Sequence, residues 1–221
     1  MSYAALYSGG KDSTLALWMA QQNGIDVSKL ITVFPKREDS YMFHKPNIHL
    51  VPKLAESLGV DLIRVYTKGE KEKEINDLKK TVSGLEVDGL ITGAVASEYQ
   101  SDRVKKIADE FGIDVYQPLW GIDQNNILDL LIKNKFNAVI VSVAAMGLNE
   151  TWLGREIDEN CASDLRTLEE KYRINVAGEG GEYETLVLAA PNYRYNFKII
   201  KSSKEWDGKR GKLKVEEIER V

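Results

Sequence analysis

The first half of the chain alternates short strand-like runs with longer segments of helical periodicity. The runs are rich in β-branched or aromatic residues and bounded by Gly, Asp or Pro. They predict strands at residues 3–7, 30–34, 61–66, 89–94 and 114–117. Between these runs apolar residues recur at helical spacing, as in the segment 51–58. Because regular strand–helix alternation is typical of a parallel sheet covered on both faces, we expect a Rossmann-like, doubly wound α/β domain.

After Pro118 the pattern changes. A helix is expected from about residue 123 to 135, with Asp123 as a candidate N-cap. The apolar run 138–143 could extend the first sheet or open a second unit. A helix near 158–172 then precedes three separated strand candidates at 185–190, 195–200 and 212–218. This order predicts a smaller C-terminal α+β domain, so we expect domains at 1–121 and 122–221.

The cysteine count, the net charge and the length of the apolar stretches exclude several classes of protein. The single cysteine, Cys161, excludes an internal disulfide and a multi-cysteine metal site, and its helical spacing with Leu165 and Leu168 predicts a core residue. A net charge of −4 argues against a broad nucleic-acid surface. The longest apolar stretch, 138–148, is shorter than the ~20 residues of a membrane span, and the N-terminus resembles no secretory signal. We therefore expect a soluble, cytoplasmic protein with no membrane or direct nucleic-acid partner.

The string SGGKDS at residues 8–13, called the phosphate loop below, follows the first predicted strand and opens a helix. Its two glycines permit a backbone in which successive N–H groups face one anion. The helix start adds further N–H groups, Lys11 adds a full positive charge, and the serines add hydroxyl donors. The expected cofactor-binding residues of this loop are Ser8, Gly9, Gly10, Lys11, Asp12 and Ser13.

The phosphate loop fits neither the Walker A pattern nor the G-x-G-x-x-G dinucleotide turn. It resembles the pyrophosphate-binding loop (PP-loop) of the N-type ATP pyrophosphatases. That resemblance implies a sheet of the HUP and PP-loop ATPase type, and ATP cut between its α- and β-phosphates. Mg²⁺ is expected with ATP, and Asp12 is a candidate ligand as well as a candidate helix cap. The alternative is an ordinary strand–turn–helix connection that contains two glycines.

Polar residues also follow the other predicted strands, where ligands bind in open α/β sheets. In the long connection 35–47, Tyr41 and His44 are expected near the adenine ring, without a metal role for the histidine. The segments 93–104 and 146–156 supply further candidates, against the alternatives of a capped helix with a surface arginine and an exposed aromatic helix. These candidates are Gly93 for the cofactor, and Tyr99, Gln100, Arg103, Trp152 and Arg155 for the substrate.

The string GEGGEYET at residues 178–185, called the acidic glycine segment below, carries Glu179, Glu182 and Glu184 around Tyr183. A turn does not need three carboxylates, and like charges in a short stretch repel one another. Their candidate uses are binding a cationic substrate, holding Mg²⁺ near ATP, or accepting a proton from an attacking amine. The alternative is a solvated acidic turn.

Together, SGGKDS and EGGEYET resemble the diphthine–ammonia ligase family, and the strings DSYMFH, GAVASEYQSDRV, PLWG and MGLNETWLGR resemble its other segments. The resemblance spans residues 8 to about 188. It implies the last step of diphthamide synthesis on translation elongation factor 2. In that step ATP adenylates the diphthine carboxylate, pyrophosphate leaves, and ammonia displaces AMP to form the amide.

Within that chemistry we assign roles as hypotheses. Lys11 would stabilise the leaving pyrophosphate, and one of the three glutamates would bind ammonium and take its proton. The other carboxylates, with Trp152 or Tyr183, would surround the trimethylammonium group of the substrate. No cysteine near the N-terminus offers a glutaminase nucleophile, so we expect free ammonium as the nitrogen source.

Two other classes of function stay open at this point. One is a different PP-loop enzyme that thiolates tRNA, although such enzymes generally use several cysteines or a metal cluster. The other is a non-catalytic sensor in which ATP switches a binding surface. Pyrophosphate release on addition of ATP, ammonium and the modified elongation factor would separate these readings.

Overall fold

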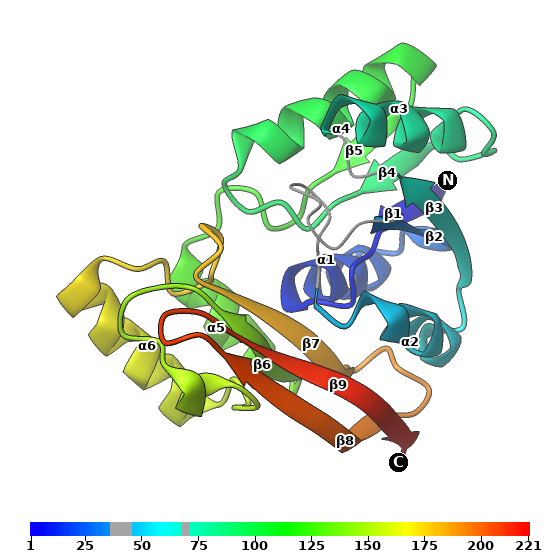
Figure 1. Ribbon diagram of the computed structural model, residues 1–221. Helices are drawn as coiled ribbons and strands as arrows, with labels where there is room; N and C mark the ends of the chain where they lie inside the picture. Colours follow the sequence, from blue (N-terminus) through cyan, green and yellow to red (C-terminus); the bar gives the residue numbers. More distant parts are fainter. Residues whose placement is uncertain (36–45, 68–70) are drawn as a thin grey trace. The chain divides into compact units, whose positions relative to one another are not determined.

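The computed structural model describes residues 1–35, 46–67 and 71–221, with the side chains of Pro35 and of residues 71–74 left out. The chain forms two compact units (Figure 1). The first consists of Met1–Ser8 and Asp12–Trp120, and the second of Gly9–Lys11 and Gly121–Val221. The short piece Gly9–Lys11 lies inside the phosphate loop and is grouped with the C-terminal half.

The first unit contains a five-stranded parallel sheet in the order β3-β2-β1-β4-β5. Its strands are β1 (Ser2–Leu6), β2 (Asp26–Pro35), β3 (Asp61–Thr67), β4 (Gly89–Ile91) and β5 (Asp114–Tyr116). The chain moves outward from β1 to β3 and then returns to the other side of β1, so the topological switch point lies between β1 and β4. The predicted Rossmann-like architecture is confirmed.

Among the described residues, helices α1 and α2 cover one face of this sheet and α3 and α4 the other (Figure 1). They are α1 (Lys11–Gln22), α2 (Val51–Leu58, after a short 3-10 turn at Ile48–Leu50), α3 (Lys71–Val82) and α4 (Glu98–Phe111). Leu78, Val82, Val104 and Ile107, four of the apolar positions that predicted helices, pack with sheet residues in one buried cluster. The strand predicted at 89–94 ends early, at Ile91.

The second unit contains a four-stranded antiparallel sheet in the order β7-β6-β9-β8. Its elements are α5 (Gln124–Lys133), β6 (Asn137–Val143), a 3-10 turn (Glu150–Trp152), α6 (Glu159–Tyr172), β7 (Tyr183–Ala189), β8 (Phe197–Trp206) and β9 (Gly211–Arg220). The apolar run at 138–143 therefore opens this second sheet and does not extend the first. The predicted α+β architecture is confirmed.

Side-chain caps fix where the helices of the second unit begin. Asp123 accepts a hydrogen bond from the N–H of Asn125 at 2.9 Å, which confirms it as the N-cap of α5. Asp158 caps α6 in the same way, accepting from the N–H of Cys161 at 2.7 Å. Cys161 is fully buried, as predicted, and burial raises the pKa of its thiol to about 11.

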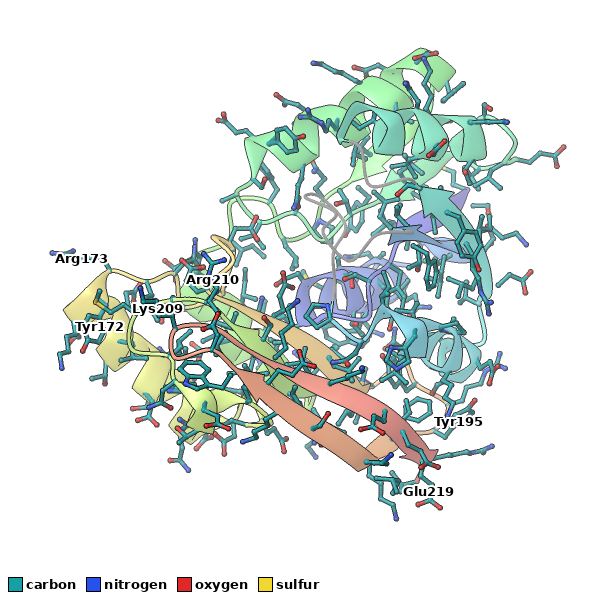
Figure 2. The ribbon with its side chains drawn as sticks, viewed as in Figure 1. Tyr172, Arg173, Tyr195, Lys209, Arg210 and Glu219 are labelled. Carbon is teal, nitrogen blue, oxygen red and sulfur yellow. The ribbon has the colours of Figure 1, made fainter. Side chains whose placement is uncertain are left out.

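The strands β8 and β9 form a long hairpin (Figure 2). Lys209 and Arg210 lie at its turn, where both N–H groups donate to the Asp207 carboxylate, and Tyr195 and Glu219 lie at its other end. These two backbone hydrogen bonds hold the pKa of the Asp207 carboxyl below its usual value. Across the parts of the chain that the structure describes, every helix is too short or too polar to cross a membrane.

Candidate active site

The phosphate loop connects the end of β1 to the start of α1, at the carboxyl edge of the parallel sheet. Gly9 adopts a φ of 76°, a left-handed conformation that favours glycine. The N–H of Ser8 donates to Ser13 Oγ at 3.2 Å, and the two serine hydroxyls lie 3.1 Å apart. The loop is therefore closed on itself by its two serines, and the residues between them form the bend.

Gly93 follows β4 and lies directly against the first turn of α1. A Cβ atom at Gly93 would come within 2.7 Å of the backbone carbonyl of Asp12 and 2.8 Å of the N–H nitrogen of Ser13. Backbone atoms cannot swing aside as a flexible side chain can. Gly93, predicted as a cofactor-binding residue, thus has a packing role that holds the helix start next to β4.

Lys11 is almost fully buried, with 3% of its surface exposed, and it contacts two residues of β7. Its backbone N–H donates to Thr185 Oγ1 at 3.0 Å, and its Nζ lies 5.6 Å from the centre of the Tyr183 ring. The N–H of Val187 donates to the carbonyl of Gly9 at 2.9 Å. The phosphate loop and the acidic glycine segment, about 170 residues apart in sequence, therefore meet at β7.

The register of β7 separates the residues of the acidic glycine segment. Side chains alternate between the two faces of a strand, so Tyr183 and Thr185 share one face and Glu184 lies on the other. The irregular pairing at this point skips Val141 on β6 and leaves the alternation of β7 intact. Tyr183 and Thr185, on the same face of β7, are the side chains that contact Lys11 in the two interactions described above.

Glu182 folds back onto its own loop. Its Oε1 accepts a hydrogen bond from the N–H of Asn175 at 3.1 Å, and a Cβ at Gly180 would lie 2.7 Å from the same oxygen. Its Oε2 is buried and has no hydrogen-bond partner among the described residues. One oxygen of this predicted catalytic carboxylate therefore anchors the loop, and the other has no partner among the described residues.

The rest of the acidic glycine segment is held by short internal hydrogen bonds. Asn175 Oδ1 accepts from the N–H groups of Ala177 at 2.9 Å and Glu179 at 3.4 Å. The Tyr183 hydroxyl donates to the carbonyl of Val176 at 2.6 Å, so its ring has a fixed position beside Lys11. The side chains of Glu179 and Glu184 are partly exposed. These internal hydrogen bonds order the backbone of the segment, and the functional use of its glutamates stays a prediction.

The predicted substrate-binding residues at the start of α4 are Tyr99, Gln100 and Arg103. The hydrogen bond of Gln100 and the stacking of Arg103 are both made within this first part of the helix. Ser97 caps the helix by accepting from the N–H of Gln100 at 3.4 Å, and the Gln100 residue is exposed. The guanidinium of Arg103 stacks on the Tyr99 ring, with its central carbon 3.3 Å from the ring centre. Gln117, which was not predicted from the sequence as a site residue, also contacts this helix, at Ser101.

Gln117 joins α4 to the segment after β5. Its Oε1 accepts from the Ser101 hydroxyl at 3.1 Å, while its Nε2 is buried without a hydrogen-bond partner in the part of the chain that the structure describes. A buried amide nitrogen of this kind usually has a partner. Gln117, which follows β5, is therefore a further, partly buried polar side chain at the carboxyl edge of the first sheet, beyond the candidates predicted from the sequence.

Trp152 and Arg155 lie in a different setting from the one predicted. Trp152 is 7% exposed and sits in a single 3-10 turn, so the interpretation of this stretch as an exposed aromatic helix is wrong. The Arg155 guanidinium stacks on the Trp152 ring at 4.6 Å, and its Nη2 pairs with Asp164 of α6 at 2.6 Å. Through Arg155, these contacts connect the 3-10 turn to α6, which indicates that they stabilise the fold of the second unit.

The remaining candidates concern the adenine ring and the metal. Tyr41 and His44 lie outside the described residues. α1 begins at Lys11, so Asp12 is in its first turn and is not its N-cap. Within residues 1–35, 46–67 and 71–221, no three His, Cys, Asp or Glu side chains cluster as a metal site. Asp12 stays a candidate for one carboxylate contact to a phosphate-bound Mg²⁺.

Comparison with known proteins identifies the family. Two family models match, the diphthamide synthase N-terminal domain over residues 1–115 and the diphthamide synthase C-terminal domain over residues 123–221. A diphthine–ammonia ligase from Bos taurus is 33% identical over 228 residues, covering 93% of this chain and 84% of that protein. A diphthine–ammonia ligase from Saccharomyces cerevisiae is 30% identical over 234 residues, covering 89% of this chain and 34% of that protein.

A solved structure described as a predicted subunit of tRNA methyltransferase from Methanocaldococcus jannaschii also aligns. Its TM-score is 0.48 at 19% identity, over 86% of this chain and 98% of that one. The family resemblance carried by the two glycine-containing strings is confirmed by the two family models and the ligase relatives. The chain belongs to the diphthamide synthase family.

Proposed function

We propose that this chain is a diphthine–ammonia ligase. It uses ATP to activate the carboxylate of diphthine on translation elongation factor 2 and ammonium to convert that carboxylate to an amide. The observation that carries the proposal is the contact of Lys11 with Tyr183 and Thr185. This contact joins the phosphate loop, which is suited to binding pyrophosphate, to the acidic glycine segment, whose sequence is the more specific of the two to the ligase family.

The first step is adenylation. An oxygen of the diphthine carboxylate attacks the α-phosphorus of ATP, the bond to the β-phosphate oxygen breaks, and pyrophosphate leaves. Lys11 and the N–H groups at the start of α1 stabilise the charge that develops on the leaving group. The ammonium of Lys11 is held beside the Tyr183 ring before ATP arrives, which lowers the cost of ordering it.

The second step is amide formation. A glutamate accepts a proton from ammonium, ammonia attacks the acyl carbon, and the carbon–oxygen bond to AMP breaks. A further proton leaves the new nitrogen to give the neutral amide. Glu182 is the first choice for the base, because Asn175 fixes one of its oxygens while the other is buried and without a hydrogen-bond partner among the described residues. The partly exposed Glu179 and Glu184 then attract the trimethylammonium group.

Magnesium supplies charge neutralisation on the phosphates when it is bound with ATP. Asp12, in the first turn of α1 next to the phosphate loop, is the side chain that would hold it together with phosphate oxygens. In this proposal residues 1–121 bind ATP and residues 122–221 provide the substrate-binding and catalytic groups. The proposed setting is the cytoplasm.

The test is a reconstituted reaction with ATP, ammonium and elongation factor 2 that carries diphthine. We expect AMP and pyrophosphate to appear together with the amide, and the amide to require ammonium. Amide formation from glutamine in ammonium-free buffer would contradict the nitrogen source. Binding of ATP without any pyrophosphate release would instead favour a nucleotide sensor, and transfer of sulfur to tRNA would favour a thiolating enzyme.

A further inference from the structure

We propose that the hydroxyl of Thr185 donates a hydrogen bond to a phosphate oxygen of ATP and of the leaving pyrophosphate. Thr185, on β7 in the C-terminal half of the chain, would thus add one hydrogen-bond donor to those of the phosphate loop. The inference rests on the proposed use of the phosphate loop for ATP. It adds a phosphate-binding and positioning residue that lies outside the loop itself.

The hydrogen bond between Lys11 and Thr185 uses the Thr185 hydroxyl as an acceptor and not as a donor. Thr185 Oγ1 accepts from the backbone N–H of Lys11 at 3.0 Å. A hydroxyl carries one donor hydrogen and two acceptor lone pairs, so accepting from Lys11 leaves its hydrogen uncommitted. The Thr185 residue is partly exposed, and the structure gives its hydroxyl hydrogen no acceptor within the described residues. The hydroxyl can therefore donate to a ligand.

The same contact changes how the start of α1 meets a phosphate. The N–H of the first helical residue would ordinarily be one of the donors that face a bound anion. Here that N–H, from Lys11, is already donated to Thr185. The hydroxyl takes the place of the lost donor, and it becomes a better one because accepting a hydrogen bond polarises its O–H group.

The position of Thr185 is set by contacts on both sides of it. Tyr183, on the same face of β7, lies against the Nζ of Lys11 at 5.6 Å. The N–H of Val187 donates to the carbonyl of Gly9 at 2.9 Å. The backbone of β7 therefore follows the loop from Gly9 to Lys11, and the Thr185 side chain lies between these two anchors.

The test compares Thr185→Val, which removes the hydroxyl at nearly constant shape, with Thr185→Ser, which keeps it. Binding of pyrophosphate and of ATP with Mg²⁺ is measured by calorimetry without protein substrate. We expect Thr185→Val to weaken both by roughly tenfold, since hydrogen bonds to charged groups are among the stronger ones. Thr185→Ser should stay within about twofold of the wild type. In turnover, the KM for ATP should rise more than kcat falls.

Thr167→Val is the matched control, because the Thr167 hydroxyl donates to the carbonyl of Ser163 on α6 and the residue is exposed. It should bind pyrophosphate as the wild type does. Thermal unfolding checks that each variant is folded. If Thr185→Val does not fold, the Thr185 methyl resonance of the wild type, assigned by its loss in Thr185→Ser, should shift on addition of pyrophosphate.

Four results would overturn the inference. The first two are wild-type affinity in a folded Thr185→Val protein and failure of Thr185→Ser to retain affinity. The other two are a methyl resonance that does not move and absence of any binding to the wild type. If pyrophosphate binding depends on the hydroxyl but no diphthamide is formed, the proposed function fails and the inference stands.

Discussion

The phosphate loop and the acidic glycine segment use glycine for opposite purposes. In the phosphate loop, Gly9 allows a left-handed bend of the backbone, with a φ of 76°. In the acidic glycine segment, Gly180 leaves room for the carboxylate of Glu182, which accepts a hydrogen bond from Asn175. The two strings thus use glycine differently. In one, glycine permits a bend of the backbone, and in the other it leaves room for a side chain that folds back on its own loop.

The largest effect is expected at Lys11, where the two regions touch. Lys11→Met keeps the length of the side chain but removes the charge that, in our proposal, stabilises the leaving pyrophosphate. We expect kcat/KM to fall by about 10³-fold, the upper range for loss of one preorganised electrostatic group. Lys105→Met is the control, because the Lys105 ammonium also lies over an aromatic ring, that of Trp120, but on the exposed side of α4. A Lys11→Met enzyme that releases pyrophosphate at the wild-type rate would refute the assignment.

Glu182→Gln tests whether the inward carboxylate is the base. Glutamine can still accept the hydrogen bond from Asn175, so the loop should keep its shape. We expect amide formation to fall by at least about 10²-fold while exchange of pyrophosphate into ATP continues, because only the proton acceptor is lost. Glu110→Gln, on α4 and paired with Lys79, is the neutral control. Unchanged amide formation with unchanged affinity would exclude Glu182 as the base.

Gly93→Ala tests the packing of the phosphate loop. The new methyl group would meet the backbone of Asp12 and Ser13, which cannot rotate away. We expect the free energy of unfolding to fall by about 2 kcal/mol, as for overpacked sites, and ATP to bind more weakly. Gly84→Ala is the matched control, since its nearest atom is the Thr81 carbonyl oxygen at 3.6 Å. Equal urea unfolding curves for the two variants would contradict this role.

Gly180→Ala tests the other use of glycine. Here the methyl group would meet the end of a side chain, the Glu182 carboxylate at 2.7 Å. The carboxylate can move, so stability should change little, but a displaced base should slow amide formation by roughly tenfold. Single-turnover amide yield and urea unfolding separate the two effects. Loss of stability equal to that of Gly93→Ala would remove the contrast between the regions.

The smallest effect is expected at Arg155. Its stacking on Trp152 and its pair with Asp164 make it a link to α6. Arg155→Gln should lower the free energy of unfolding by about 1 kcal/mol, typical of a partly exposed ion pair with an aromatic contact. The KM for the protein substrate should not change. A large rise in that KM with unchanged stability would restore the substrate-binding role predicted from the sequence.

The sequence predicted the fold better than it predicted the contacts of the site. Alternation of short strands and helices was enough for the parallel sheet, and the cap at Asp123 was visible in the string itself. The sheet to which residues 138–143 belong could not be predicted, because a largely apolar strand fits the core of either unit.

Residues that act through long-range contacts carried no local signal. Asn175 and Gln117 sit in ordinary stretches of sequence, and their roles come from hydrogen bonds across a loop and between elements. Thr185 could have been noticed, because strand alternation places it on the face of Tyr183. Its hydrogen bond to Lys11 joins residues 174 positions apart and required the structure.

The central claim is that the phosphate loop and the acidic glycine segment act in one reaction. The most direct measurement follows isotope-labelled ammonium into elongation factor 2 by mass spectrometry while AMP and pyrophosphate are quantified. We predict equal amounts of labelled amide, AMP and pyrophosphate. ADP and inorganic phosphate as the products of ATP, or an amide without the label, would contradict the account.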